Sequence, residues 1–207
     1  MNRDSNLESL LESIKAIAQE GLSFAEDDYD IARYQKLRDL VAKNYADISG
    51  AATAKIREEL FTEQGCITPK LGVDTAIMNE DGAVLVLKRP DGSWGMPGGW
   101  ADVGESPFAT AQRETFEESG LSISPIGYVL ITHRTPLTHP GSVSQVNICV
   151  GAKKVPIDST ITLSHEHSDY KWIHSVEEID NWHTGQKRLF PRIFDAYRND
   201  IFIPDVQ

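Results

Sequence analysis

The chain has 207 residues, of which 40% are hydrophobic and 25% charged, and its formal net charge at pH 7 is −11. This composition is typical of a globular protein, no apolar run approaches the roughly 20 residues that cross a bilayer, and the acidic balance argues against binding a nucleic-acid backbone. We therefore expect no membrane and no nucleic-acid partner. Because the N-terminus lacks the apolar core of a signal peptide, we also expect a cytoplasmic location.

The first 65 residues are predicted to form a helical domain. Apolar residues recur at helical spacing over residues 7–18, and Gly21 is the expected end of this helix. Further helices are expected over residues 28–45 and 51–61. These segments contain no catalytic constellation, so we interpret them as a scaffold that packs on the rest of the chain or on a second subunit. Amphipathic helices with few partners suit a homodimer interface, but one sequence does not separate the two kinds of packing.

A second domain, residues 66–207, is predicted to belong to the α+β class. A stretch with two glycines and a proline (GCITPKLG) marks its start. Short β-like runs follow at residues 73–78, 83–89, 126–134, 143–150 and 170–174, and two helices are expected at 176–182 and 184–198. A longer helix lies in the middle of the domain. Ser106 is its expected N-cap, Pro107 its first residue and Gly120 its end.

This central helix carries Glu114, Glu117 and Glu118, which share one face within an arc of roughly 100°. Like charges at such spacing weaken a helix. Arg113 lies four residues before Glu117 and can pair with it, but one arginine does not neutralise three glutamates. The residues expected to pack inward from the other faces are Phe108, Ala111, Thr115 and Phe116.

Two interpretations of the glutamates remain open from their spacing. They form either a solvated acidic face, the usual role of a run of charges, or a site for a divalent cation such as Mg²⁺, which prefers oxygen ligands. The preceding Gly98 and Gly99 favour the cation site, because paired glycines let the backbone approach a ligand closely. Glu105 adds a further carboxylate near the start of the helix.

The same stretch resembles the signature of the Nudix hydrolases. With every spacing kept, the signature positions are occupied by Gly99, Glu105, Arg113, Glu114, Glu117, Glu118, Gly120 and Leu121. Thr115 stands where the family has an apolar residue, and its methyl group can still pack there. The preceding WGMPGG is also similar to the family. A pattern with this many fixed positions is not expected by chance.

The resemblance implies a Nudix fold, in which a mixed β-sheet is sandwiched between helices. It also implies hydrolysis of a nucleoside diphosphate linked to another group, with Mg²⁺ or Mn²⁺ as cofactor. By position, Glu114 and Glu118 would be the main metal ligands, Glu117 would assist, and the Gly98 carbonyl would complete the set. Glu105 is counted with the metal site.

The resemblance assigns supporting roles as well. Glu105 and Arg113 would orient the ligands through hydrogen bonds and ion pairs. Arg113, for this role, and Glu117, which would assist the metal ligands, are also predicted to be catalytic residues. The segment EHSDYKWI is similar to a family segment whose leading glutamate, here Glu166, often acts as a ligand or base. Glu166 is the predicted base, and the alternative is a solvated loop carboxylate. His165 and His167 are interpreted as loop residues rather than transition-metal ligands, because a carboxylate site prefers a harder ion.

The substrate is predicted from the helical region, which resembles the N-terminal extension of a Nudix subgroup that includes ADP-ribose and CDP-choline pyrophosphatases. Arg89, His133 and Arg134 are the predicted phosphate contacts, and the equal alternative for Arg89 is a surface residue at the edge of a strand. One alternative is a catalytically inactive Nudix-fold module that binds nucleotides in regulation, although such a module could lose Glu114 or Glu118 freely. Another is a structural or partner-binding protein built on the helices, which leaves the glutamates unexplained.

Overall fold

The computed structural model describes residues 3–49, 52–54, 56, 68–135, 144–183 and 185–205. The chain divides into two compact units, one made of Met1–Lys70 with Arg134–Gln145 and the other of Leu71–His133 with Val146–Gln207. The predicted domain boundary at residue 65 falls between residues 56 and 68, outside the described ranges, and its position stays a prediction.

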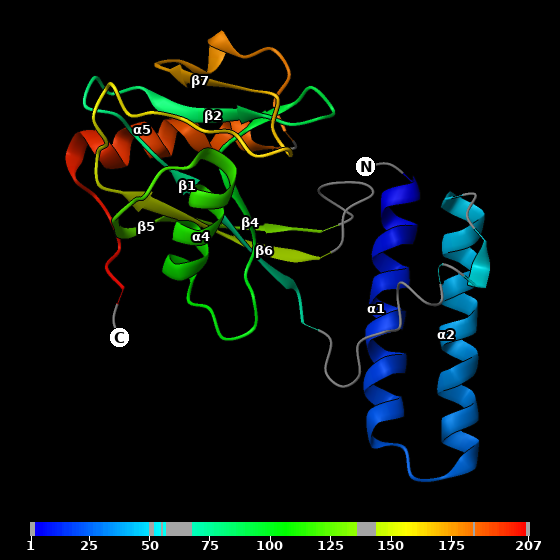
Figure 1. The fold of residues 1–207 in the computed structure, drawn as a ribbon. Helices are drawn as coiled ribbons and strands as arrows, with labels where there is room; N and C mark the ends of the chain where they lie inside the picture. The colour runs from blue at the N-terminus through cyan, green and yellow to red at the C-terminus, as the bar shows by residue number, and fades with distance from the viewer. Residues whose placement is uncertain are drawn as a thin grey trace. The chain divides into compact units, whose positions relative to one another are not determined.

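The first unit contains two packed helices, α1 (Arg3–Phe24) and α2 (Asp28–Ser49) (Figure 1). Their shared buried residues include Leu11 of α1 and Val41, Ala42 and Ala46 of α2. The Asp27 carboxylate precedes α2 and accepts hydrogen bonds from the N–H groups of Tyr29 and Asp30 at 2.9 and 3.0 Å. It therefore satisfies two of the amide groups that the first turn of a helix leaves without an intrahelical partner.

The prediction that Gly21 ends the first helix is wrong, because α1 continues through it to Phe24. A Cβ atom at Gly21 would lie 2.3 Å from ring carbons of Tyr34 in α2. The glycine therefore allows the two helices to approach each other closely. The third predicted helix, over residues 51–61, lies mostly outside the described residues.

The second unit is built mainly on two sheets. The four-stranded sheet has the order β4-β1-β6-β5, with β1 Lys70–Ala76, β4 Gly98–Trp100, β5 Pro125–Arg134 and β6 Gln145–Ala152. The three-stranded sheet has the order β3-β2-β7, with β2 Val84–Lys88, β3 Trp94–Gly95 and β7 Asp169–Ile173. Every predicted strand is present. The short β3 and β4 were missed, because their glycine-rich stretch lacks the alternation of a strand.

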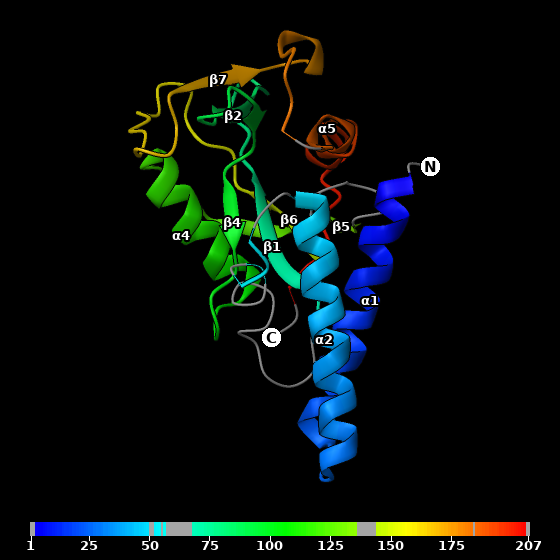
Figure 2. The same cartoon turned by 90° about the vertical axis from the view of Figure 1, so that its right-hand side faces the viewer.

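Helices α4 (Pro107–Ser119) and α5 (Phe190–Asn199) lie on opposite sides of the strands (Figure 2). Strand β2 contributes to both cores, because its alternate side chains point to opposite faces. Val86 packs in the cluster that includes α5, and Leu85 packs in the cluster that includes α4. The α+β class predicted from the sequence is thus confirmed, with the strands divided over two sheets.

The segment after β7 departs from the prediction of a helix over residues 176–182. It forms one 3₁₀ turn, η1 (Val176–Glu178), followed by bends and by an isolated bridge between Trp182 and Trp94. The Trp94 N–H donates to the Asn181 carbonyl at 2.8 Å, and the His183 N–H donates to the Trp94 carbonyl at 2.7 Å. Pairing with β3 therefore replaces helical hydrogen bonds. The second predicted helix is divided into η2 (Gln186–Leu189) and α5.

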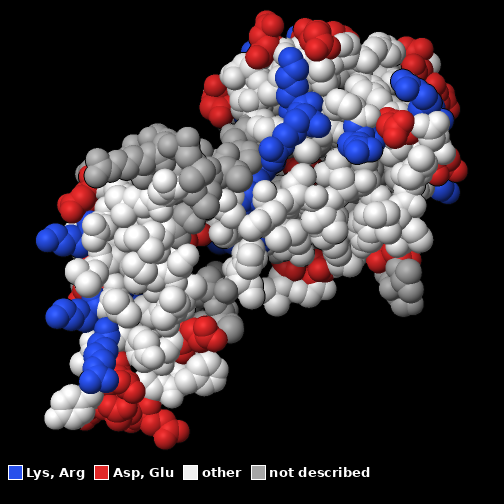
Figure 3. Space-filling model, turned by 180° about the vertical axis from the view of Figure 1, so that it is seen from behind, with Lys and Arg blue, Asp and Glu red and all other residues white. Residues whose placement is uncertain are grey.

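The acidic balance of the sequence is visible on the surface. Glu26, Asp27 and Asp28 are exposed at the turn between α1 and α2, where red atoms gather at one end of the helical unit (Figure 3). None of the helices in the described ranges combines the length and hydropathy that crossing a bilayer requires.

Candidate active site

The helix that carries the glutamates, α4, has the predicted boundaries. The Ser106 hydroxyl accepts a hydrogen bond from the Ala109 N–H at 3.2 Å, and Gly120 adopts a φ of 71°, in the left-handed region. Thr115 is fully buried, but the prediction that Phe116 packs inward is wrong, since this side chain is 59% exposed. The helix packs through small residues, and Glu118 takes one of its buried positions.

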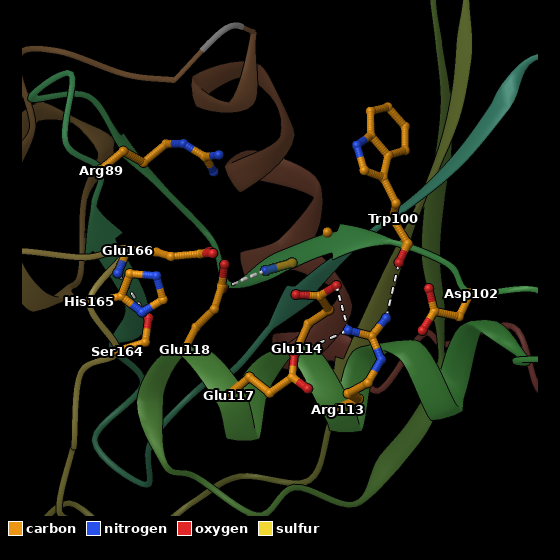
Figure 4. Close-up of a pocket in the computed structure, with 12 residues that line it drawn as sticks. Arg89, Trp100, Asp102, Arg113, Glu114, Glu117, Glu118, Ser164, His165 and Glu166 are labelled. Carbon is orange, nitrogen blue, oxygen red and sulfur yellow. Dashed lines mark hydrogen bonds and ion pairs between the residues drawn. The ribbon is translucent and has the colours of Figure 1, made fainter. Parts of the chain in front are cut away.

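The glutamates of α4 line a cavity of about 640 Å³ (Figure 4). Its described lining residues are Arg89, Gly98, Gly99, Trp100, Asp102, Arg113, Glu114, Glu117, Glu118, Ser164, His165 and Glu166. The structure therefore brings β4 and α4 together with the loop before β7, which lies far from both in the sequence. Arg89 follows β2 and points toward the carboxylates from the other side of the cavity (Figure 4).

Glu118 is the most buried of these carboxylates, with 5% of its surface exposed. Its pKa is raised to about 8, mainly by burial and also by the nearby carboxylates of Glu114 and Glu166, against a hydrogen bond from the Gly98 N–H at 2.9 Å. Burial also raises the pKa of Glu114, although Arg113 opposes this shift. The cavity therefore concentrates negative charge that the protein does not fully compensate.

Arg113 uses all five of its N–H donors within the protein. The bonds run to both oxygens of Glu105 at 2.9 and 3.0 Å, to Glu114 at 2.8 Å, to Glu117 at 3.2 Å and to the Trp100 carbonyl at 3.0 Å. No donor remains for a substrate. Arg113 therefore orients Glu114 and Glu117, and a direct role in the chemistry is not supported.

Glu105 was grouped with the metal ligands, but the structure gives it a different surrounding. Besides Arg113, its carboxylate accepts hydrogen bonds from the Asp102 N–H at 3.2 Å and the Thr110 hydroxyl at 2.9 Å. The arginine holds the pKa of Glu105 down, at about 2. Glu105 is also absent from the described residues that line the cavity. The geometry therefore supports its predicted orienting role and not direct metal binding.

The two glycines before the helix are required by close contacts. A Cβ atom at Gly98, where φ is 154°, would lie 2.1 Å from the Val73 carbonyl oxygen. A Cβ atom at Gly99 would lie 2.3 Å from Oε1 of Glu114. Strand β4 pairs with β1 through these residues, so the glycines allow a carboxylate to lie directly against the sheet.

The loop before β7 contributes Ser164, His165 and Glu166 to the cavity. His165 is exposed, whereas His167 is buried, and Nε2 of His167 lies 3.8 Å from Oε1 of Glu118. Burial and the nearby Arg89 lower the pKa of His167 and favour its neutral form. The two histidines thus have different surroundings, and their interpretation as loop residues stays a prediction.

The donor set fits a hard divalent cation by its chemistry. In the described ranges, no three carboxylate, imidazole or thiolate groups converge closely enough to ligate one ion. Glu114 and Glu117 bind Arg113 instead, and Glu118 binds Gly98. The oxygen-rich lining and the raised pKa of Glu118 nevertheless match what such an ion requires, since a cation would stabilise the ionised carboxylates.

Of the three predicted phosphate contacts, one lines the cavity and two do not. Arg89 lines the cavity, and none of the described residues forms an ion pair with it. His133 is exposed and Arg134 buried at the end of β5, and neither lines the cavity, so the structure does not support them as substrate contacts. Sequence reasoning missed Trp100 and Asp102, whose only signal was their position between Gly99 and Glu105.

Two protein families match different parts of this chain. The family described as the NUDIX domain matches residues 68–193, and the one described as the UDP-X-like, N-terminal oligomerisation domain matches residues 6–61. The chain is 36% identical over 127 residues to Bacillus subtilis YjhB, named for a proposed ADP-ribose pyrophosphatase activity, with 61% of each chain covered. It is 33% identical over 106 residues to Nucleoside diphosphate-linked moiety X motif 6 of Xenopus laevis. That match covers 49% of this chain and 48% of the relative, so the chain spans about half to three-fifths of these relatives' lengths.

Solved structures have the same fold. A UDP-X diphosphatase aligns over 96% of this chain and 98% of its own, with a TM-score of 0.57 and 21% identity. An ADP-ribose pyrophosphatase from Streptococcus suis aligns over 65% of this chain and 96% of its own, with a TM-score of 0.52 and 25% identity. Since the family match covers more than half of the chain and contains the whole glutamate helix, this protein belongs to the Nudix family and carries a helical N-terminal extension.

Proposed function

We propose that this chain is a metal-dependent pyrophosphohydrolase that cleaves the pyrophosphate bond of a nucleoside diphosphate linked to another group. The observation that carries the proposal is the placement of Glu114 and Glu118 in one cavity, opposite a guanidinium group from Arg89. Carboxylates gathered this way attract cations, and a cation together with Arg89 attracts a diphosphate. ADP-ribose and CDP-choline are the first candidate substrates, and the activity proposed in the name of YjhB supports the former.

The residues of the cavity suit Mg²⁺ or Mn²⁺ as the cofactor. Glu114 and Glu118 would hold the ion, Glu117 would assist, and the Gly98 carbonyl would complete the set. When bound, such an ion neutralises diphosphate charge and lowers the pKa of water. Arg113 and Glu105 maintain the carboxylate positions through their network of hydrogen bonds.

Glu166 is the proposed proton acceptor in this reaction. It lines the same cavity as Glu118 and is exposed, so it can meet a water molecule beside the bound diphosphate. As the water oxygen bonds to phosphorus and the bond to the bridging oxygen breaks, the water proton passes to the Glu166 carboxylate. Arg89 stabilises the charge that remains on the leaving phosphate.

A substrate panel tests the activity. ADP-ribose, CDP-choline, nucleotide sugars, dinucleoside polyphosphates and oxidised nucleotides are incubated with Mg²⁺, with Mn²⁺ or with EDTA, and phosphate is measured after coupling to a phosphatase. We expect turnover of ADP-ribose or CDP-choline with metal and none with EDTA. Binding of these nucleotides without turnover would favour the inactive regulatory module instead.

The helical unit is proposed to form a homodimer. Leu10, Ile17 and Phe24 of α1 are 54%, 59% and 76% exposed and recur every seven residues, so they form one apolar stripe. An exposed stripe of this kind is typical of an interaction surface, and the matched family of this region is described as an oligomerisation domain. Light scattering coupled to size exclusion tests the proposal. A monomer at micromolar concentration would contradict it.

A further inference from the structure

The rim of the cavity carries an aromatic side chain that the proposed chemistry does not use. Trp100 is the only Phe, Tyr or Trp among the described residues that line the cavity, and it is 47% exposed. Its backbone is held on two sides, because it pairs with Gly72 of β1 and its carbonyl accepts a hydrogen bond from Arg113. Nearly half of this large aromatic residue is thus exposed on a backbone that is held in place.

The two ends of the cavity differ in charge. At one end, Arg89 offers a guanidinium group without an ion pair among the described residues. At the other end, Trp100 and Asp102 stand beside Arg113, whose donors are all engaged (Figure 4). The Arg89 end therefore suits phosphate groups. Among the described lining residues, none at the Trp100 end has a cationic group with an unused donor, so this end suits the uncharged part of a ligand.

The geometry of β4 connects these two ends. Gly99 faces Glu114, so the next residue, Trp100, directs its side chain to the opposite face of the strand. Because β4 is the edge strand of its sheet, the indole stands at the rim, away from the carboxylates (Figure 4). Gly98 and Gly99 have no side chains that obstruct this edge, so a ligand can pass over it from the carboxylates to the indole.

We propose that Trp100 is the platform on which the nucleobase of the substrate stacks while the diphosphate lies over the carboxylates toward Arg89. The substrate class rests on the proposed function, but the stacking is a property of binding and does not require turnover. Bases stack on aromatic rings through their π-faces, and such contacts tolerate different bases. The inference makes Trp100 a specificity residue that selects nucleoside-containing diphosphates over those without a base.

The test measures binding of AMP and of inorganic pyrophosphate to the full chain in Ca²⁺ by calorimetry. We expect Trp100→Ala to weaken AMP binding by about 5- to 150-fold, the range for loss of one base stack, and to leave pyrophosphate binding unchanged. Trp100→Phe keeps a ring and should retain most of the AMP affinity. AMP should quench the tryptophan fluorescence of the wild type and not that of Trp100→Phe, which leaves Trp94, Trp172 and Trp182 in place.

The matched control is Phe116→Ala, which removes another exposed aromatic ring from outside the cavity lining and should alter neither affinity. Unchanged AMP affinity in Trp100→Ala, or equal loss of AMP and pyrophosphate, would overturn the inference. Quenching by phosphocholine and not by AMP would do the same, because Trp100 would then bind a quaternary ammonium group. Absence of turnover with intact AMP stacking would contradict only the proposed hydrolysis.

Discussion

The helical unit exposes apolar side chains to solvent, whereas the α+β unit buries charged ones. Helix α4 keeps carboxylates inside a cavity, where Glu118 is 5% exposed, whereas α1 leaves Ile17 and Phe24 on its outside, at 59% and 76% exposure. Neither arrangement stabilises the isolated chain, because a buried charge and an exposed apolar ring both cost free energy. We propose that a bound cation offsets the first cost and that a second subunit offsets the second. Such local costs mark the proposed sites of cation binding and self-association.

The largest expected effect comes from removing the buried charge of α4. Glu118→Gln keeps the acceptor for the Gly98 N–H but removes the ionised oxygen that would bind a cation. We expect kcat/KM with Mg²⁺ to fall on the order of 1,000-fold, above the 10- to 100-fold typical of outer partners of metal ligands. Glu80→Gln changes the same charge at an exposed position and should retain full activity. Full activity of Glu118→Gln would contradict the proposal that Glu118 binds the metal ion.

The buried carboxylate of Glu118 is also expected to make the free energy of unfolding depend on pH. Burial raises the pKa of Glu118 from 4.5 to about 8, so between these values the folded protein binds more protons than the unfolded chain. Without metal, the free energy of unfolding should therefore fall by a few kcal/mol as pH rises from about 4.5 to about 8. Urea denaturation in EDTA measures this slope. Glu118→Gln should flatten it, and Mg²⁺ at pH 8 should restore stability; an unchanged slope in the variant would show that Glu118 is not its source.

The exposed stripe of α1 gives the corresponding test in the helical unit. Ile17→Glu places a charge in the proposed interface and leaves the buried contacts of Leu11 and Val41 intact. We expect the dissociation constant of the dimer to rise by about tenfold or more, or about 1.4 kcal/mol, with unchanged helix content by circular dichroism. Leu11→Ala is the contrast, since it should lower the melting temperature through loss of core packing. A dimer of unchanged affinity in Ile17→Glu would place self-association elsewhere.

The smallest effect concerns the close approach of the sheet to the carboxylates. Gly99→Ala brings a Cβ atom to 2.3 Å from Oε1 of Glu114 and should displace that flexible side chain. We expect about a tenfold loss of activity, comparable to loss of an orienting partner, with little change in melting temperature. Gly82→Ala, where no atom lies within 4 Å of the added Cβ, should cost about 1 kcal/mol of stability through its positive φ and no activity. Equal activity of the two variants would contradict the role of Gly99.

Features that depend on interactions within one helix were predicted correctly, whereas features that depend on contacts between elements were not. The boundaries of α4 were predictable, because Ser106, Pro107 and Gly120 act on their own helix. The predicted end of α1 at Gly21 and the inward position of Phe116 were wrong, because a residue in another element or the choice of buried face decided them. The helix predicted at residues 176–182 failed for the same reason, since its backbone pairs with β3.

By itself, the sequence determined the glutamate helix, its caps, the need for glycine before it and the membership in the Nudix family. These features depend on the spacing of residues close together in the chain, which the sequence gives directly. Only the tertiary structure decided that Glu105 binds Arg113, that His133 and Arg134 lie outside the cavity lining, and that Trp100 stands at its rim. Those outcomes depend on strand order and on which donors are already engaged, which follow from contacts between residues far apart in the sequence.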